Sequence, residues 1–492
     1  MQATLLLSLR QDISQSEQSE DQVTLQAEYV SLPHTSLTLK QLSPASRSAL
    51  EQLLAEGATE EELSAQVLQN DGVPGLYKWN FYMRKLSEYS LLCYTLCADH
   101  EPLATVIPLA IYHKFDSKMV KPEKRYILSR FAHCRREQND IILESPLGYA
   151  QVKLHNAQAL AMVAELGQPR NCQELSASFD GCSEDVASGF LNLLLNAQAV
   201  SEVDEDGAVL EDTNPALAQW EFHDLLFHTR SRLGRHNNPF GKTYRFKGQI
   251  DPLPLVKPRM SDEIIPLHKP DLEQLKRTDP PFCQVLEGRR SIRHQGEQPI
   301  TDQQLGEFLY RSARVKLTYH DELGGVTFRP YPGGGALHEL EIYAVIDRCE
   351  NIPSGLYHYD PLEHQLCKLS DRNWYVETLL EMAWHMISEE SRPQVLFVIT
   401  ARFQRVQWKY DSIAYSVILK DLGGLYQTMY LVAEAMGLAP CALGGGHSDL
   451  FAQAAGLDYY AETSVGGFVL GSRHLSAEGQ LDEQEWRSKP GW

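Results

Sequence analysis

The sequence predicts a multidomain α+β protein, and three features carry that prediction. A pattern of two strands, three helices and one strand occurs twice within residues 1–205. The rest of the chain alternates apolar strands with amphipathic helices, one of them long, and places two glycine-rich loops between them. With 492 residues, 43% of them hydrophobic, the chain is long enough for two or three packed cores.

The amino-acid composition limits the classes of partner that the protein can bind. The formal net charge of −20 disfavours nucleic acid and anionic membranes. No run of about eighteen apolar residues occurs and the N-terminus lacks a cleavable secretion signal, so we expect a cytoplasmic protein that does not bind membranes. The nine cysteines are odd in number and widely spaced, which favours reduced thiols over disulfides.

The first copy of the repeated pattern is predicted to form a domain over residues 1–97. Alternation over 24–32 and 36–42 indicates strands, and Ser43-Pro44 and Thr59 are typical helix starts. A third helix follows, in which Trp79, Phe81 and Tyr82 form an apolar stripe expected to face the core. The second copy, predicted over 98–205, contains two strands around a Pro-Leu-Gly turn, three helices and a closing strand.

This order of elements is a winged-helix arrangement, which binds either DNA or an extended peptide strand along its sheet edge. Residues 1–97 contain six Lys/Arg and twelve Asp/Glu, a net charge of −6, which weighs against DNA. Peptide binding and a purely structural role both stay open. Residues 206–280 are expected to form a connector, and His223, Asp224 and His228 in it are interpreted as a polar face over a domain junction, with no metal.

The predicted C-terminal domain, residues 281–492, begins with an arginine cluster. Arg289, Arg290 and Arg293 surround Ser291, just before a helix capped by Thr301. Forked guanidinium donors and a hydroxyl group suit a phosphate, although such turns are also common on solvated surfaces.

Two glycine-rich loops follow. Pro332 and Gly333, Gly334 and Gly335 precede an apolar strand at 340–346, and Leu443, Gly444 and Gly445 precede a strand that ends at Arg473. Glycines let the backbone approach a flat ligand closely, although the first loop could equally be a plain tight turn. A hairpin over 353–366 and a buried strand over 392–403 lie between the loops.

A long amphipathic helix is predicted over 407–436. Gly423 and Gly424 in its middle each cost roughly 1 kcal/mol in helix propensity. We expect close packing against another helix, across a dimer interface, to offset that cost. Lys409 and Tyr410 at its start are the polar residues that could take part in catalysis. Adjacent residues of a helix do not face each other, so both can face one site only where the chain is not yet helical.

The five motifs occur in an order that resembles the SagB-type dehydrogenases, and most closely the cyanobactin thiazoline oxidases. They are Arg-Arg-Ser-x-Arg, Pro-Gly-Gly-Gly-Ala-Leu-His-x-Leu-Glu, Gly-Leu-Tyr-His-Tyr-Asp-Pro, Trp-Lys-Tyr and Ala-Pro-Cys-Ala-Leu-Gly-Gly-Gly. Two positions depart from the family: Gly333 stands where Ser is common, and His447 stands where a small amide or acid is usual.

The resemblance implies an FMN-dependent, nitroreductase-like C-terminal domain that forms a homodimer, preceded by two winged-helix, peptide-clamp-like domains that hold a precursor peptide. It assigns the FMN phosphate and ribityl chain to Arg289, Arg290, Ser291 and Arg293, helped by Arg473. The resemblance also implies that Pro332 to Gly335 line the isoalloxazine ring from the partner subunit. It places Leu443, Gly444 and Gly445 near the reactive edge of that ring. Lys409 and Tyr410 match the pair to which the family assigns proton transfer.

The activity so implied is oxidation of thiazolines and oxazolines in a precursor peptide to azoles, with dioxygen as electron acceptor. We expect the Lys409 ammonium to lower the pKa of Tyr410 by favouring the phenolate. Two alternatives stay open: an NAD(P)H-dependent nitroreductase or quinone reductase of the same fold, and a peptide-binding winged-helix module with an inert C-terminal domain.

Overall fold

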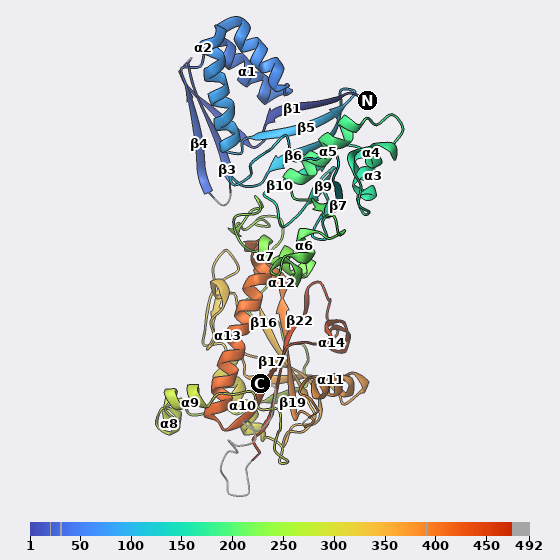
Figure 1. Cartoon of the computed structure of the whole chain (residues 1–492). Helices are drawn as coiled ribbons and strands as arrows, with labels where there is room; N and C mark the ends of the chain where they lie inside the picture. The colour runs from blue at the N-terminus through green and yellow to red at the C-terminus, as the bar shows by residue number, and fades with distance from the viewer. Residues whose placement is uncertain (20, 30–31, 390, 475–492) are drawn as a thin grey trace. The chain divides into compact units, whose positions relative to one another are not determined.

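The computed structural model describes residues 1–19, 21–29, 32–389 and 391–474, and the last part of the predicted C-terminal domain, 475–492, lies outside them. The chain divides into two compact units, Met1–Phe240 and Gly241–Trp492 (Figure 1).

The first unit opens with the first copy of the predicted pattern. A three-stranded sheet of order β2-β3-β4 precedes helices α1 and α2. Ser43 and Thr59 cap these helices as predicted, because each side chain accepts a hydrogen bond from a backbone N–H of the first turn. Gly72 has φ +67 and breaks α2 into the predicted second and third helices. The bounds are β2 Ile13–Ser19, β3 Gln22–Tyr29, β4 Leu32–Lys40, α1 Pro44–Ala55 and α2 Glu60–Glu88.

The predicted stripe on α2 is partly wrong. Trp79 and Tyr82 are buried, but Phe81 is 46% exposed. At about 100° per residue, Trp79 and Tyr82 lie only about 60° apart around the helix, whereas Phe81 lies about 160° from Trp79, so Phe81 cannot face the same core. It lies with Tyr77, 74% exposed, on the solvent-facing side of the helix.

A six-stranded antiparallel sheet of order β1-β5-β6-β10-β9-β8 joins the two copies within this unit. The second copy has the predicted helices α3, α4 and α5, and its closing strand β11 pairs with β7. The sequence analysis did not predict β1, β2, β6, β7 or β8. The bounds are β1 Ala3–Leu9, β5 Leu92–Ala98, β6 Glu101–Pro108, β7 Arg125–Leu128, β8 His133–Glu137, β9 Asp140–Glu144, β10 Ala150–Leu154, α3 Ala157–Glu165, α4 Cys172–Ala177, α5 Glu184–Asn196 and β11 Val200–Val203.

The predicted connector begins with short helices and continues largely without regular structure. It contains α6 Leu210–Thr213, η1 Leu217–Gln219, α7 Phe222–Arg230, β12 Gly241–Lys242, β13 Ile264–Pro266 and α8 Leu272–Thr278. Figure 1 shows α6 and α7 in green.

The second unit is built on a seven-stranded antiparallel sheet of order β13-β18-β17-β16-β19-β22-β21. Successive side chains of β16 point to opposite faces. Ile342 and Ala344 pack with α10 and α13, whereas Tyr343 and Val345 pack with α11 and α14. The bounds are α10 Asp302–Ala313, β16 Leu340–Ile346, β17 Gly355–Asp360, β18 Gln365–Asp371, α11 Trp374–Met386, β19 Val395–Arg402, α13 Ala414–Ala435, β21 Leu438–Leu443, α14 Ser448–Ala455 and β22 Glu462–Ser472.

Helix α13 starts at Ala414, later than the predicted start at residue 407, because a short helix and strand precede it. The remaining bounds are α9 Phe282–Gly288, β14 Leu317–Tyr319, β15 Val326–Phe328, η2 Gly334–Ala336, α12 Phe403–Gln407 and β20 Tyr410–Asp411. Within the described residues no helix is both long and apolar enough to span a membrane.

Candidate functional site

The arginine–serine segment lies against α13 and β21. The Ser291 hydroxyl hydrogen-bonds the Tyr430 hydroxyl at 2.7 Å, and the Arg289 guanidinium stands over the Tyr430 ring, 5.2 Å from its centre. The Ile292 N–H donates to the Pro440 carbonyl at 2.7 Å, which fixes the segment to the strand. Arg290 and Arg293 are half-buried in the same stretch. The segment therefore gathers guanidinium and hydroxyl donors at one place, as a phosphate requires.

Tyr430 also joins this segment to the second glycine loop. The Ala442 N–H donates to the Tyr430 hydroxyl at 2.7 Å, one residue before Leu443. An ideal Cβ at Gly444 would meet nothing within 4 Å, so the loop borders open space. The adjacent small cavity is mostly apolar and is lined by Leu443, Gly445, Met382 and Met386, among others. The sequence analysis missed Tyr430, because it belongs to an apolar helix stripe whose hydroxyl contacts are made only in three dimensions.

Arg473 reaches the same region, but its guanidinium is engaged. It is 2.6 Å from the Glu434 carboxylate, both side chains are largely buried, and it donates to the Leu438 carbonyl at 3.0 and 3.2 Å. An isolated bridge between Gln295 and Arg473 places it beside the arginine–serine segment. It can bind a phosphate only if the ion pair with Glu434 rearranges.

The first glycine loop packs on the N-terminal half of α13. The Gly334 N–H donates to Asp421 Oδ2 at 2.7 Å, and an ideal Cβ at Gly334 would lie 2.2 Å from the side chain of Val417. A Cβ at Gly333 would lie 2.8 Å from His338 Nδ1, so the serine common at this position in the family requires that histidine to move. A side chain at either position therefore requires a neighbouring side chain, His338 or Val417, to move.

Pro332 explains one of the two glycines in the middle of α13. An ideal Cβ at Gly424 would lie 2.9 Å from the Pro332 side chain, whereas one at Gly423 would meet nothing within 4 Å. The expectation that another helix packs against both glycines is therefore wrong for Gly424, where the close neighbour is the loop of the same chain.

Lys409 and Tyr410 converge on Gly335. The Lys409 ammonium donates to the Gly335 carbonyl at 3.3 Å, and an ideal Cβ at Gly335 would lie 2.5 Å from the Tyr410 hydroxyl and 2.9 Å from Lys409 Nζ. Both residues precede α13: Lys409 lies between α12 and β20, and Tyr410 is the first residue of β20, which pairs with β12. Both residues lie ahead of the helix, where the sequence analysis expected that they could face one site.

The expected electrostatic effect between these two residues is wrong. Burial raises the pKa of Tyr410, and Lys409 does not lower it. Burial, followed by the charge of Lys242, lowers the pKa of Lys409 instead. The ammonium lies 5.7 Å from the centre of the Tyr410 ring and bonds a carbonyl, so it does not stabilise a phenolate.

The predicted residues thus form two groups in one chain. The first, around Tyr430, contains Arg289 to Arg293, Arg473 and the Leu443–Gly445 loop; the second, around Asp421, contains Pro332 to Gly335, Lys409 and Tyr410. Nine residues of helix separate Asp421 from Tyr430, about 13 Å of rise and two and a half turns. Asp421 and Tyr430, the residues of α13 that the two groups contact, therefore leave the helix in opposite directions.

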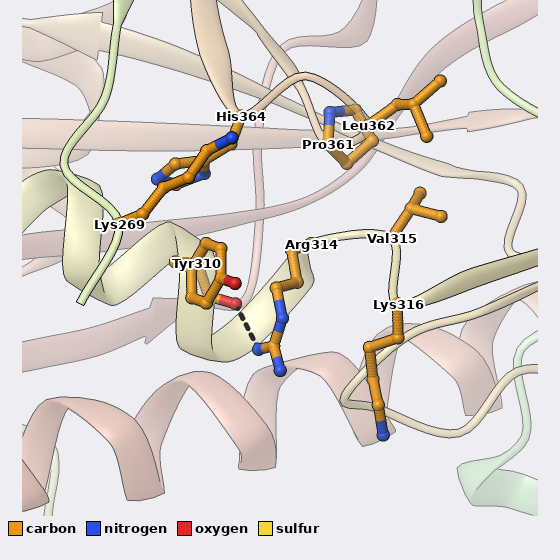
Figure 2. A pocket seen from close by; sticks show the side chains of 8 residues that line it. All are labelled: Lys269, Tyr310, Arg314, Val315, Lys316, Pro361, Leu362 and His364. Atoms are coloured by element: carbon orange, nitrogen blue, oxygen red, sulfur yellow. Dashed lines mark hydrogen bonds between the residues drawn. The ribbon is translucent and has the colours of Figure 1, made fainter. Parts of the chain in front are cut away.

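A third feature of this unit is separate from both groups. It is a cavity of about 410 Å³, and no acidic side chain and no predicted site residue is among its described lining residues. Figure 2 shows the side chains that line it. Arg314 donates to the Tyr310 carbonyl at 2.8 Å within it. The lining is Lys269, Tyr310, Arg314, Val315, Lys316, Pro361, Leu362 and His364.

Three family models match the chain in order. The helix-turn-helix domain of the cyanobactin oxidase ThcOx matches residues 1–117, the cyanobactin oxidase ThcOx matches 126–237, and the nitroreductase family matches 286–472. The chain has the domains of a cyanobactin oxidase. The resemblance inferred from the five motifs is thereby confirmed, and the chain is an oxidoreductase of the nitroreductase family with an N-terminal helix-turn-helix domain.

Individual relatives match mainly the C-terminal part of this chain. A protein of Methanocaldococcus jannaschii named as a nitroreductase is 27% identical over 175 residues, 36% of this chain and 81% of its own length. The microcin B17-processing protein McbC of Escherichia coli is 32% identical over 119 residues, 23% of this chain and 43% of its own length. A Ralstonia eutropha structure titled as a nitroreductase is similar, with 22% identity and a TM-score of 0.35, over 49% of this chain and 100% of that one.

Proposed function

We propose that the protein is an FMN-dependent oxidase that converts thiazolines and oxazolines in a precursor peptide into thiazoles and oxazoles, with dioxygen as the electron acceptor. The observation that carries this proposal is the convergence of Lys409 and Tyr410 on the Gly335 loop. Azoline oxidation removes a proton from Cα and a hydride from Cβ, and a proton acceptor beside a flavin-lining loop meets the first requirement.

The first group fits the tail of FMN. Arg289, Ser291 and Arg293 offer forked and single donors to the phosphate, and the loop at Gly444 borders open space that a flat ring can occupy. Bound FMN supplies a two-electron acceptor for the hydride. The protein's own contribution is to grip the phosphate and to let the backbone of the glycine loops approach the ring.

Lys409 is the better candidate for the proton acceptor. Its pKa is lowered by burial, which increases the fraction of neutral amine near neutral pH, whereas the raised pKa of Tyr410 keeps its hydroxyl protonated. We assign proton removal to Lys409 and orientation of the substrate by hydrogen bonding to Tyr410.

A homodimer through the C-terminal domain is part of the proposal. Because Asp421 and Tyr430 leave α13 in opposite directions, we infer that the loop of Pro332 to Gly335 and the Lys409–Tyr410 pair act on FMN held by the partner's arginine–serine segment. In a symmetric homodimer, the two-fold axis that brings the first group of one chain to the second group of its partner also forms the second, identical site.

The precursor peptide is proposed to bind the first unit. A groove of about 690 Å³ lies between β4 and α2, where β4 is the edge of its sheet. An edge strand can accept an extended peptide as a further strand, and the exposed rings of Tyr77 and Phe81 provide apolar contacts. Its charged lining residues are Lys40, Lys78 and Lys85. The groove therefore suits a peptide that carries carboxylates.

The test uses the purified chain, FMN and a thiazoline-containing peptide under air. We expect flavin absorbance near 450 nm and a loss of about 2 Da per ring, without nicotinamide cofactor. NAD(P)H consumption with quinones or nitroarenes, and no change in the peptide, would favour the nitroreductase alternative. A colourless protein that takes up no FMN would favour the other alternative, a peptide-binding module with an inert C-terminal domain.

A further inference from the structure

The cavity of Figure 2 is lined by three cationic side chains that come from three separate segments. Lys269 lies between β13 and α8, Arg314 caps the end of α10, and Lys316 directly precedes β14. None of the described lining residues is acidic, and among the described residues these three cations form no ion pair. The cavity therefore concentrates positive charge in a chain whose net charge is −20.

Two acidic residues flank the lining segment of Pro361 and Leu362, but neither lines the cavity. The Asp360 carboxylate accepts the backbone N–H groups of Leu362 and Glu363, at 3.0 and 3.2 Å. Its second oxygen accepts the Gln365 amide at 3.1 Å. Asp360 is thus engaged by its own turn, and Glu363 is exposed. The cations of the cavity are left for a ligand.

His364 and Tyr310 form a fixed, neutral part of the wall. His364 Nε2 donates to the His268 carbonyl at 2.9 Å, and its Nδ1 accepts the Tyr359 hydroxyl at 2.9 Å. Burial lowers the pKa of His364 to about 4, so its ring carries no charge near neutral pH. The Tyr310 ring meets the His364 ring edge-on, with the ring centres 5.0 Å apart. The positive charge of the cavity therefore comes from the two lysines and the arginine.

Arg314 is held in place and still keeps donors for a ligand. A guanidinium group has five N–H donors, and Arg314 Nη1 uses one of them on the Tyr310 carbonyl at 2.8 Å. The guanidinium also stands over the Tyr310 ring, 4.4 Å from its centre. Among the described residues, the ammonium groups of Lys269 and Lys316 donate no hydrogen bond. One forked donor and two point charges together suit a ligand with more than one phosphate group.

The size and the apolar part of the cavity indicate a ligand larger than an inorganic ion. Its volume of about 410 Å³ lies within the range of about 300–1,000 Å³ that is usual for small-molecule sites. Val315, Pro361 and Leu362 supply an apolar wall, and Leu362 is 50% exposed. The Val315 N–H donates to the Pro361 carbonyl at 2.8 Å, which joins the two segments of that wall. A planar base can lie against this wall while phosphates reach the cations.

We propose that this cavity binds a nucleoside di- or triphosphate, with Lys269, Arg314 and Lys316 holding the phosphates and the apolar wall contacting the base. The site is distinct from the arginine–serine segment, because no residue of 289–293 is among its lining residues. The proposal does not rest on the proposed function, since it involves neither FMN nor the precursor peptide.

The test is a calorimetric titration of the flavin-free full chain with ADP and with adenosine. We expect ADP to bind and adenosine to bind at least about tenfold more weakly, because adenosine lacks the phosphates. Lys269→Met and Lys316→Met should each weaken ADP binding about tenfold, the scale of one lost charged hydrogen bond. Both lysines are exposed, so the unfolding midpoints should stay at the wild-type value. Lys118→Met, at an exposed lysine of the first unit, is the matched control and should bind ADP like wild type.

Two results would overturn the proposal directly: no ADP binding by wild type, or equal ADP affinity in wild type and in a variant with both lysines replaced. Arg293→Ala is titrated in parallel, and we expect it to keep ADP binding. Loss of ADP binding in Arg293→Ala alone would assign the nucleotide to the arginine–serine segment and contradict the cavity site. A peptide rich in glutamate that binds tightly, depends on both lysines and excludes ADP would replace the nucleotide as the ligand. Failure of the proposed function leaves all these outcomes unchanged, because no titration contains FMN.

Discussion

Replacing Gly335 by alanine probes the proposed chemistry with a single methyl group. Gly335 has φ +61, a left-handed conformation that costs an L-residue about 1–2 kcal/mol. The new Cβ would also lie 2.5 Å from the Tyr410 hydroxyl and 2.9 Å from Lys409 Nζ, so one of these groups must move by about 1 Å. A displacement of that size at a reacting centre can cost about 10²-fold in rate.

We therefore expect Gly335→Ala to bind FMN and to lower the unfolding midpoint by only about 2–8 °C, while azole formation slows about 10²-fold. The rate is measured as the loss of 2 Da from a thiazoline peptide. Gly456→Ala is a matched control, because Gly456 has a similar φ of +65 but its Cβ would meet nothing within 4 Å. The reasoning is refuted if Gly335→Ala, loaded with FMN, forms azoles at the wild-type rate.

Three further predictions concern the two groups. Lys409→Met and Tyr410→Phe should each slow azole formation by about 10²-fold with FMN retained. Because the pKa of Lys409 is lowered, the wild-type rate should rise with pH up to that lowered value; Lys409→Met should abolish this rise and Tyr410→Phe should keep it. Tyr430→Phe breaks two hydrogen bonds and should weaken FMN binding about tenfold in a fluorescence titration. Glu434→Gln leaves the Arg473 charge buried without its partner, and urea unfolding should show a loss of about 3 kcal/mol.

The features of the fold that could be predicted are those that depend on residues close together in the sequence. Helix starts at Ser43, Thr59 and Thr301 are correct, because a cap depends on residues within one turn. Strand β1 was missed, because its partner β5 lies far away in sequence. Strand β6 was also missed, although it forms a tight hairpin with β5. Phe81 was misplaced because a run of aromatic residues does not by itself give the direction of each side chain.

The same distinction applies to the candidate site. The glycines at 334 and 335 could be singled out because their backbone requirement is visible in the sequence. Tyr430 and Asp421 could not be singled out, because an apolar helix pattern does not predict the hydrogen-bond partners of a hydroxyl or carboxyl group on that helix. The opposite pKa shifts of Lys409 and Tyr410 also required the structure, because burial outweighs the effect of neighbours in sequence.

The arrangement around α13 makes the proposed dimer testable by complementation. If each active site takes its arginine–serine segment from one chain and Lys409 from the other, Arg293→Ala and Lys409→Met impair different halves of a site. A mixed dimer of the two variants then contains one site with both halves intact and one with both halves changed.

Refolding an equal mixture should give about half mixed dimers, each with one of two sites working, and so about a quarter of the wild-type activity. Each variant refolded alone should stay near its own low activity. A site built within one chain predicts something different, because every site in the mixture then carries one of the two changes. Activity no higher than that of the separate variants, in a mixture shown to contain mixed dimers, would therefore contradict the shared site and place both halves around the same helix.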